Sequence, residues 1–198
     1  MKGRVYPLFC SPVYGKVIDQ NVKDIFSSLK KEPFDPANNQ GTSASRNKKI
    51  LDKFPQLRKI LLKEFNYFKN TYLHYVNTDF CITTSWMTKC TPNSCGYRHN
   101  HKNCVYSGVL YFQDEISSIQ FSNENIIPES MWLGDPSEYN LYNSTSWEIK
   151  PEKNLMIIFP SYLFHKVTTH TSEEDRYSLA FNLFPKGNFG KNDSSISL

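Results

Sequence analysis

The feature that most constrains the fold is a series of short segments between Asp79 and Phe184 that share one texture. Each segment is rich in β-branched or aromatic residues, and turn-forming residues separate it from the next. The segments read FCITTSWMTK, CVYSGVLYF, SSIQFS, TSWEIK, NLMIIFP, HKVTTH and RYSLAFNLF. This pattern predicts antiparallel strands packed as a β-sandwich or jelly roll.

Two amphipathic helices are predicted before the strands. Apolar residues recur at steps of three and four over 17–31 and again over 55–73, where each set forms one helical stripe. Asp52 could cap the second helix, and Pro55 suits its first turn. The stretch between the helices, 33–46, is rich in turn formers and has little to bury, so we expect a loop there.

Length bounds the organisation of the chain. A chain of 198 residues fits one domain with a real core. We therefore predict a single, mainly β (α+β) domain over 1–198. In it, 1–78 form a helical supporting region, 79–185 form the β core and 186–198 form a polar, flexible tail. The interval 123–146 has little periodicity, which is typical of a functional loop.

Charge and hydropathy exclude some classes of partner. The net charge of +4 comes without a block of lysine and arginine, so charge indicates no nucleic-acid partner. No segment approaches 18 apolar residues, and the N-terminus lacks the apolar run of a signal peptide. We expect a soluble, cytoplasmic protein with no membrane partner, and the sequence indicates no oligomeric state. The odd number of cysteines, five, suits an intracellular chain that keeps its thiols reduced.

Three histidines are candidates for a metal site. The stretch RHNHKNCVYSGVLYF puts His99 and His101 one residue apart, directly before a predicted strand. Side chains at positions i and i+2 of an extended segment point to the same face. Downstream, His165 lies at the junction of two predicted strands in MIIFPSYLFHKV. Three imidazoles suit iron, zinc, copper or nickel, and they leave positions open for a substrate or an oxidant.

Arg176 and Ser178 are candidates for an anion site, because they share one face of the strand predicted in DRYSLAFNLF. One interpretation is a surface arginine paired with the acidic residues just before it, at 173–175. The other is an inward guanidinium that binds a carboxylate at two points, with the serine hydroxyl as a further donor. An inward arginine without an anion is costly, so this second interpretation predicts an acidic small molecule.

The residues alone leave three other classes open. A zinc-knuckle binding module would use Cys90, Cys95, His99 and Cys104, although the spacing of four, three and four intervening residues lacks the usual tight cysteine pair. A non-oxidative metal-binding barrel of the cupin type would keep the three histidines and have no need of an inward arginine. A metal-free jelly roll would scatter all of these side chains.

Five ordered blocks resemble a known family. The blocks are SW-M-T, HNHKN, SGVLYF, FPSYLFHKV and RYSLAFN, and the match covers Ser85 to Phe184. They are similar to blocks in the iron(II)/2-oxoglutarate-dependent oxygenases, and most of all to a 2OG-Fe(II) oxygenase family found in bacteria and phages. This resemblance implies a double-stranded β-helix and the cytoplasm of a bacterium or a phage-infected host.

The resemblance also implies an activity and roles for single residues. Fe(II) would be held by His99, His101 and His165, and 2-oxoglutarate and O2 would be the cosubstrates. Arg176, helped by Ser178, would bind the far carboxylate of 2-oxoglutarate, and Tyr111 would add a hydrogen bond. An unidentified substrate would be hydroxylated, with release of succinate and CO2. Apart from the resemblance, the aromatic residues of the long loop and its borders, at 132, 139, 142 and 147, are candidates either for lining a substrate pocket or for anchoring the loop by packing.

The sequence departs from the wider superfamily at one ligand. Most members carry His-x-Asp or His-x-Glu, so that a carboxylate joins two histidines on the metal. This chain has His101 at that position. Two alternatives stay open: His101 is the first ligand with Asn103 in the carboxylate position, or an acid such as Asp114 arrives from elsewhere.

Overall fold

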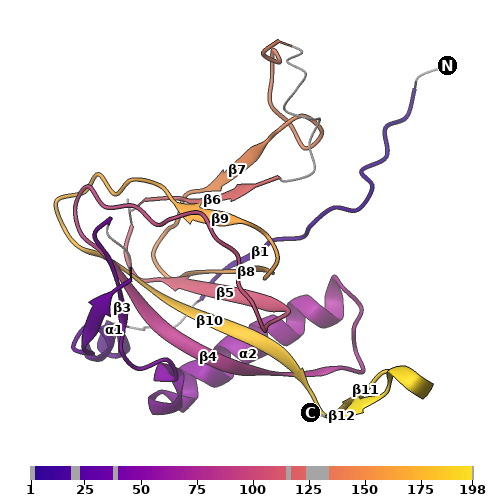
Figure 1. The fold of residues 1–198 in the computed structure, drawn as a ribbon, viewed down its shortest axis with the longest axis horizontal. Helices are drawn as coiled ribbons and strands as arrows, with labels where there is room; N and C mark the ends of the chain where they lie inside the picture. The colour runs from indigo at the N-terminus through magenta and orange to yellow at the C-terminus, as the bar shows by residue number, and fades with distance from the viewer. Residues whose placement is uncertain (1–2, 19–22, 38–39, 115–116, 124–133, 198) are drawn as a thin grey trace.

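Two antiparallel sheets face each other in the computed structural model, which describes residues 3–18, 23–37, 40–114, 117–123 and 134–197 (Figure 1). The main sheet has seven strands in the order β1-β8-β5-β10-β4-β3-β2. The minor sheet has three, in the order β7-β6-β9. The two sheets share a core of residues from β5, β8 and β6. This arrangement confirms the predicted β-sandwich of the double-stranded β-helix type.

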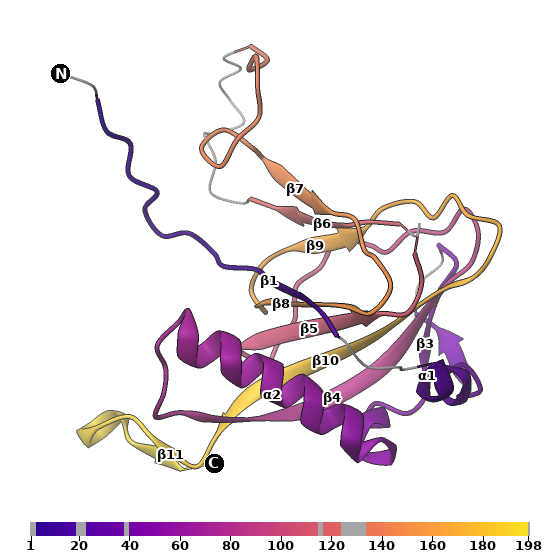
Figure 2. The same cartoon turned by 180° about the vertical axis from the view of Figure 1, so that it is seen from behind.

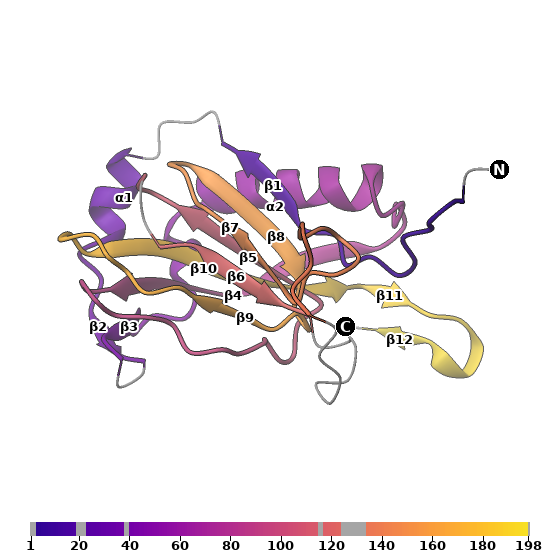
Figure 3. The same cartoon turned by 90° about the horizontal axis from the view of Figure 1, so that it is seen from above.

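The strands that form the two sheets include all the segments expected from sequence texture. The strands of the main sheet, in its own order, are Tyr14–Val17 (β1), Leu155–Pro160 (β8), Tyr106–Tyr111 (β5), Arg176–Lys186 (β10), Asp79–Cys90 (β4), Thr42–Ser45 (β3) and Phe34–Pro36 (β2). Those of the minor sheet are Ser146–Ile149 (β7), Ile119–Ser122 (β6) and His165–Val167 (β9). Figure 3 shows the minor sheet lying over the strands of the main sheet. The long central strand β10 pairs with β5 on one side and β4 on the other.

The two faces of the main sheet have different partners. One face packs against helix α2, Pro55–Thr71, which crosses in front of the strands in Figure 2. Alternate residues of β10, among them Leu179 and Phe181, are fully buried in this core with Leu61 and Phe65 of α2. The opposite face looks toward the minor sheet. Strand pleating therefore divides β10 into a core side and an inter-sheet side.

The predicted helices are present, with corrected ends. Helix α1 runs over Lys23–Leu29, inside the expected 17–31. Val17 belongs instead to strand β1, residues 30–31 form a turn, and residues 19–22 lie outside the described part of the chain. Helix α2 begins at Pro55, as its first-turn proline predicted. The capping prediction for Asp52 is wrong. That residue belongs to a 3-10 helix, Ile50–Lys53, where its carboxylate pairs with Arg58.

The loop prediction for 33–46 is also wrong in part. Strands β2 and β3 pair with each other, and β3 pairs with β4. An added edge strand is held by backbone hydrogen bonds, so its sequence needs few apolar residues. The buried Ser45 contributes further, because its hydroxyl accepts a hydrogen bond from the backbone N–H of Met87 at 3.0 Å. The sequence predicted a loop here because turn-forming residues dominate the composition of 33–46.

Beyond β10, a small hairpin pairs Asn188–Phe189 (β11) with Ile196–Ser197 (β12), around a 3-10 turn at Asn192–Ser194. The polar composition of this segment did not predict any strand. Among the helices in the described ranges, none has both the length and the apolar character to cross a membrane. The assignment of 1–78 as a supporting region and 186–198 as a flexible tail stays a prediction.

Candidate metal and anion site

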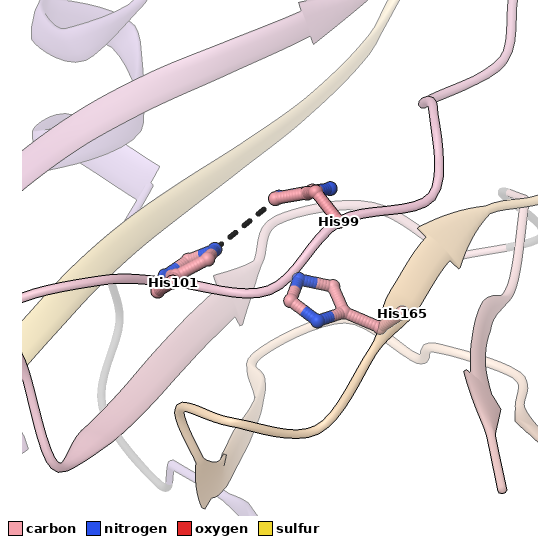
Figure 4. Close-up of side chains that lie close together, drawn as sticks. All are labelled: His99, His101 and His165. Atoms are coloured by element: carbon pink, nitrogen blue, oxygen red, sulfur yellow. Dashed lines mark hydrogen bonds between the residues drawn. The ribbon is translucent and has the colours of Figure 1, made fainter. Parts of the chain in front are cut away.

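The three predicted histidines lie together in the space between the sheets (Figure 4). His99 and His165 form an isolated antiparallel bridge, with His99 N–H donating to His165 O at 2.9 Å and the return bond at 2.8 Å. His101 follows two residues later, so its ring joins theirs from the same segment. One ring nitrogen from each residue lies within 4.8 Å of the other two.

Hydrogen bonds to Nδ1 orient each imidazole. The Nδ1 of His99 lies 2.9 Å from the carbonyl oxygen of Tyr97, and the Nδ1 of His165 lies 3.0 Å from that of Leu163. A carbonyl oxygen can only accept, so both Nδ1 atoms carry hydrogen and both Nε2 atoms keep a lone pair. Hydrogen bonds of this kind fix the tautomer of metal-binding histidines in general.

The geometry of the cluster fits a metal ion. The Nε2 atoms of His99 and His101 are 3.3 Å apart. Two nitrogen ligands, each about 2.1 Å from one ion and about 90–110° apart, are separated by about 3.0–3.4 Å. Two lone pairs that face each other at this distance repel unless a proton or a cation lies between them. The donor set is therefore suited to a divalent transition metal.

Burial keeps two of the imidazoles neutral. Desolvation lowers the pKa of His165 to about 3, with smaller contributions from the neighbouring His99 and His101. Desolvation also lowers the pKa of His101. An imidazole must be unprotonated to bind a metal, so burial prepares these rings for that task at neutral pH.

The structure does not bring the alternative ligands to the cluster. Asn103 is exposed, and the Oδ1 of Asp114 accepts a hydrogen bond from the backbone N–H of Lys153 at 2.8 Å. In the described part of the chain, the three histidines form a candidate metal group without any acidic residue or cysteine. These contacts favour His101 over Asn103 and Asp114 as the third ligand, and that role stays a prediction.

The zinc-knuckle prediction is wrong, because its cysteines point to different partners. The Sγ of Cys90 is buried and lies 3.7 Å from Nη1 of Arg176. The Sγ of Cys95 lies 3.3 Å from the side-chain oxygen of Gln40. The Sγ of Cys104 lies 3.4 Å from the carbonyl oxygen of Lys102.

Arg176 is buried on the inter-sheet side of β10, with only 1% of the residue exposed. Its Nη1 donates to Ser178 Oγ at 3.5 Å, and its Nε has no hydrogen-bond partner among the described residues. The surface interpretation is therefore wrong: the nearby Asp175 pairs with Lys89 at 2.8 Å instead. No described carboxylate forms an ion pair with Arg176.

Tyr111 forms one wall of the arginine site. It lies opposite Ser178 in the pairing of β5 with β10, and its ring centroid is 5.3 Å from the guanidinium carbon of Arg176. Burial raises the pKa of Tyr111 to about 12, against an opposing effect of the arginine charge. The phenol is therefore neutral and available as a hydrogen-bond donor.

A buried guanidinium without an acid needs an anion from outside the chain. Arg176 has the apolar ring of Tyr111 beside it and the weakly polar thiol of Cys90 opposite it in the pairing with β4. Neither group carries the charge that would balance the guanidinium. The arrangement supports the predicted carboxylate site, while the roles of Arg176, Ser178 and Tyr111 as cosubstrate ligands stay predictions.

The aromatic residues of the long loop and its borders differ in how they lie relative to the histidines. Trp147 lies opposite Phe121 in the pairing of β7 with β6, and Phe121 lies opposite His165 in the pairing with β9. Trp147 therefore shares the inner face of the minor sheet with His165, although it remains 50% exposed. Tyr139 and Tyr142 are exposed on the loop. The predicted Trp132 lies outside the described residues.

Asn182 is a polar residue of the site that the sequence interpretation missed. Its Oδ1 lies 2.8 Å from Nδ1 of His101 and accepts a hydrogen bond from Ser107 Oγ at 2.9 Å. The signal was present, because Asn182 is six positions from Arg176 and therefore on the same face of the strand. Every second residue of RYSLAFN points to the same face of the strand, so following this alternation past Ser178 leads to Asn182.

Comparison with known proteins gives a family and a fold. A family model described as "Putative 2OG-Fe(II) oxygenase" matches residues 84–182, which include all three histidines and the arginine. No curated protein matches the sequence.

Solved structures are similar to this chain at low identity. A prolyl-4-hydroxylase from Pseudomonas putida aligns with a TM-score of 0.59 and 13% identity, covering 91% of this chain and 96% of that one. HygX from Streptomyces hygroscopicus, with nickel and 2-oxoglutarate bound, aligns with a TM-score of 0.59 and 14% identity, covering 88% of this chain and 83% of that one. The epimerase SnoN from nogalamycin biosynthesis aligns with a TM-score of 0.64 and 8% identity, covering 91% of this chain and 82% of that one. These similarities show a shared fold.

Proposed function

The chain belongs to the 2OG-Fe(II) oxygenase family, and on that premise we propose that it is a dioxygenase that hydroxylates an organic substrate. The coupled reaction consumes O2 and 2-oxoglutarate. One oxygen atom enters a C–H bond of the substrate, and the other enters succinate as CO2 is lost. HygX, which has been solved with nickel and 2-oxoglutarate, shares this fold and supports the proposed cosubstrate.

One observation carries the proposal: a cationic side chain without an acid lies in the same inter-sheet space as three convergent imidazoles. Arg176 is buried, and no described carboxylate forms an ion pair with it. In a metal-binding barrel without a dicarboxylate cosubstrate, the free-energy penalty of burying this unpaired guanidinium would not be offset by an anion. A non-oxidative function is therefore disfavoured.

We assign the metal to His99, His101 and His165, through their Nε2 atoms. Fe(II) bound there would activate O2 and supply the oxidising power of the reaction. The three neutral imidazoles add no charge to that of the ion, whereas a set with one carboxylate would subtract one. The dianionic cosubstrate would therefore be attracted more strongly to this site than to one that already holds an acid.

Arg176, Ser178 and Tyr111 would hold the cosubstrate. The guanidinium offers two parallel N–H groups to the distal carboxylate, and the serine and tyrosine hydroxyls offer further donors. Burial of this end excludes water and strengthens the charge-assisted bonds. The histidine end is more open, since His99 and His101 are both partly exposed. A substrate would approach from that side.

The test is an anaerobic titration of the purified protein with Fe(II) and then 2-oxoglutarate. We expect one Fe(II) per chain, a weak visible absorption band when 2-oxoglutarate is added, and slow succinate release in air. His165→Ala should lose the metal and the band while the protein stays folded. His74→Asn is the matched control, because His74 is exposed and its φ of 58° suits asparagine.

Two outcomes would overturn the proposal. One is wild-type protein that binds Fe(II) without any change on addition of 2-oxoglutarate. The other is a His165→Ala variant that retains stoichiometric iron and the absorption band.

A further inference from the structure

We infer that Asn182 is the residue that positions His101 for metal binding, by accepting a hydrogen bond from its Nδ1. This inference rests on the proposed function and adds a positioning residue to it. Asn182 lies on β10, whereas His101 lies in the segment before β5. The contact therefore links one ligand to the same strand that carries Arg176.

The first argument is local and concerns the acceptors of the other two histidines. In both, Nδ1 donates to the carbonyl oxygen two residues earlier, that of Tyr97 for His99 and that of Leu163 for His165. The corresponding oxygen for His101 belongs to His99. That oxygen already accepts the backbone N–H of His165 at 2.8 Å. The Nδ1 of His101 lies instead 2.8 Å from Asn182 Oδ1 and 2.9 Å from Ser107 Oγ.

The second argument is the direction of the hydrogen bonds around Asn182. Its Nδ2 donates to Thr84 Oγ1 at 3.0 Å, and its Oδ1 lies on the side of His101. Ser107 Oγ donates to the same Oδ1 at 2.9 Å, so its hydroxyl hydrogen is not directed at Nδ1 of His101, from which Oγ lies 2.9 Å. Ser107 has a single hydroxyl hydrogen, so Ser161, 2.8 Å away, must donate to Ser107.

The network therefore ends at Asn182 Oδ1, the common acceptor for Ser107 and His101. Because the amide oxygen only accepts, Nδ1 of His101 carries hydrogen and Nε2 keeps its lone pair. That lone pair faces Nε2 of His99 at 3.3 Å. An amide at position 182 thus selects the one tautomer that is able to bind a metal together with His99.

The charge of Asn182 adds a second consequence. An aspartate at this position would form a carboxylate–histidine–metal arrangement, which raises the basicity of the ligand. Asn182 provides the same geometry without the charge. The Asn182→Asp variant therefore separates the two properties, since it keeps the acceptor and changes only the charge.

Cobalt binding in the absence of oxygen and cosubstrate is the test. Loss of an outer hydrogen-bond partner typically weakens metal binding about 10–100-fold. We expect that loss in Asn182→Ala, and binding at wild-type strength or tighter in Asn182→Asp. Asn100→Ala is the matched control: Asn100 lies between the two ligands, but its side chain donates to Tyr162 O at 3.3 Å. It should bind cobalt as the wild type does.

A second measurement uses the metal-free protein. Nitrogen-15 NMR of the histidine side chains reports which ring nitrogen carries hydrogen. We expect the Nδ1–H tautomer of His101 in the wild type and a mixture of tautomers in Asn182→Ala, while His99 and His165 stay unchanged. This result would also identify an Asn182→Ala chain that has lost its fold, because all three signals would then change.

The inference and the proposed function fail in different ways. Wild-type cobalt affinity in a folded Asn182→Ala variant, or an unchanged His101 tautomer, would overturn the inference alone. Wild-type protein that binds neither cobalt nor Fe(II) would overturn both.

Discussion

The two sides of β10 show how one strand serves two purposes. The side toward α2 carries Leu179 and Phe181, which are fully buried among other apolar residues. The side toward the minor sheet carries Arg176, Ser178 and Asn182. The first set finds its partners within the chain. The second set faces the three histidines and includes a buried guanidinium whose Nε has no hydrogen-bond partner among the described residues.

This difference teaches where stability and function are located. Apolar burial on the helix side stabilises the sheet regardless of any ligand. A buried guanidinium on the other side destabilises the metal-free, anion-free chain. Substitutions on the two sides should therefore change unfolding and ligand binding in different directions.

The largest effect is expected on the helix side. Phe181→Ala should lower the free energy of unfolding by about 3–5 kcal/mol, because it leaves a cavity in the core against Gly108. Urea denaturation measures this loss. Phe9→Ala removes the same side chain from a fully exposed position and should have little effect. If Phe181→Ala lowers the free energy of unfolding by less than about 1 kcal/mol, the α2 side of β10 does not have the stabilising role that distinguishes it from the other side.

The next effect belongs to ligand binding. Arg176→Ala should weaken 2-oxoglutarate binding by about 2–5 kcal/mol, roughly 30-fold to several thousand-fold, and leave Fe(II) binding intact. Arg176→Lys should rescue only part of the loss, since an ammonium keeps the charge without the two-point geometry. Titration of the iron-loaded variants measures both. Unchanged 2-oxoglutarate affinity in folded Arg176→Ala would remove the main argument for the anion site.

A third prediction has the opposite sign from the first. Arg176→Met replaces a buried, unpaired charge with an apolar side chain of similar length. Without ligands, this variant should be as stable as the wild type or more stable by about 1–4 kcal/mol. Urea denaturation of the metal-free protein checks it. A clear loss of stability would mean that Arg176 contributes to the fold itself.

The smallest effects are expected for the cysteines. Cys90→Ser should leave metal content unchanged and alter 2-oxoglutarate affinity by less than about tenfold, because the thiol makes only a long contact of 3.7 Å with Arg176. Cys95→Ser should change neither. Metal analysis and cosubstrate titration are the measurements. Loss of a metal from either variant would instead support a metal site with cysteine ligands.

Sequence texture predicted much of the fold, because alternation of apolar residues directly reflects burial of strand faces. It missed β2 and β3, since edge strands depend on backbone hydrogen bonds that composition does not record. It also assigned Val17, which belongs to β1, and the turn at residues 30–31 to the first helix. These errors concern the edges of the main sheet, where side-chain packing contributes least.

The candidate site was predictable residue by residue only where spacing was short. His99 and His101 share a face by simple parity, and Arg176 and Ser178 do the same. The tertiary bridge between His99 and His165 depends on how two distant segments pair, which one sequence does not contain. Asn182 was missed because the parity shared by Arg176 and Ser178 was not followed further along the strand, and its contact with His101 depends on how two distant segments pack.

The position of β10 has a consequence for synthesis of the chain. β10 is made after every other strand of the main sheet, yet it lies between β5 and β4. Until it emerges from the ribosome, β4 and β5 have unpaired edges in the middle of the future sheet. Such edges invite pairing with other chains. Folding of this protein therefore depends on rapid insertion of its last central strand, and a nascent chain stalled before Arg176 should aggregate or require a chaperone.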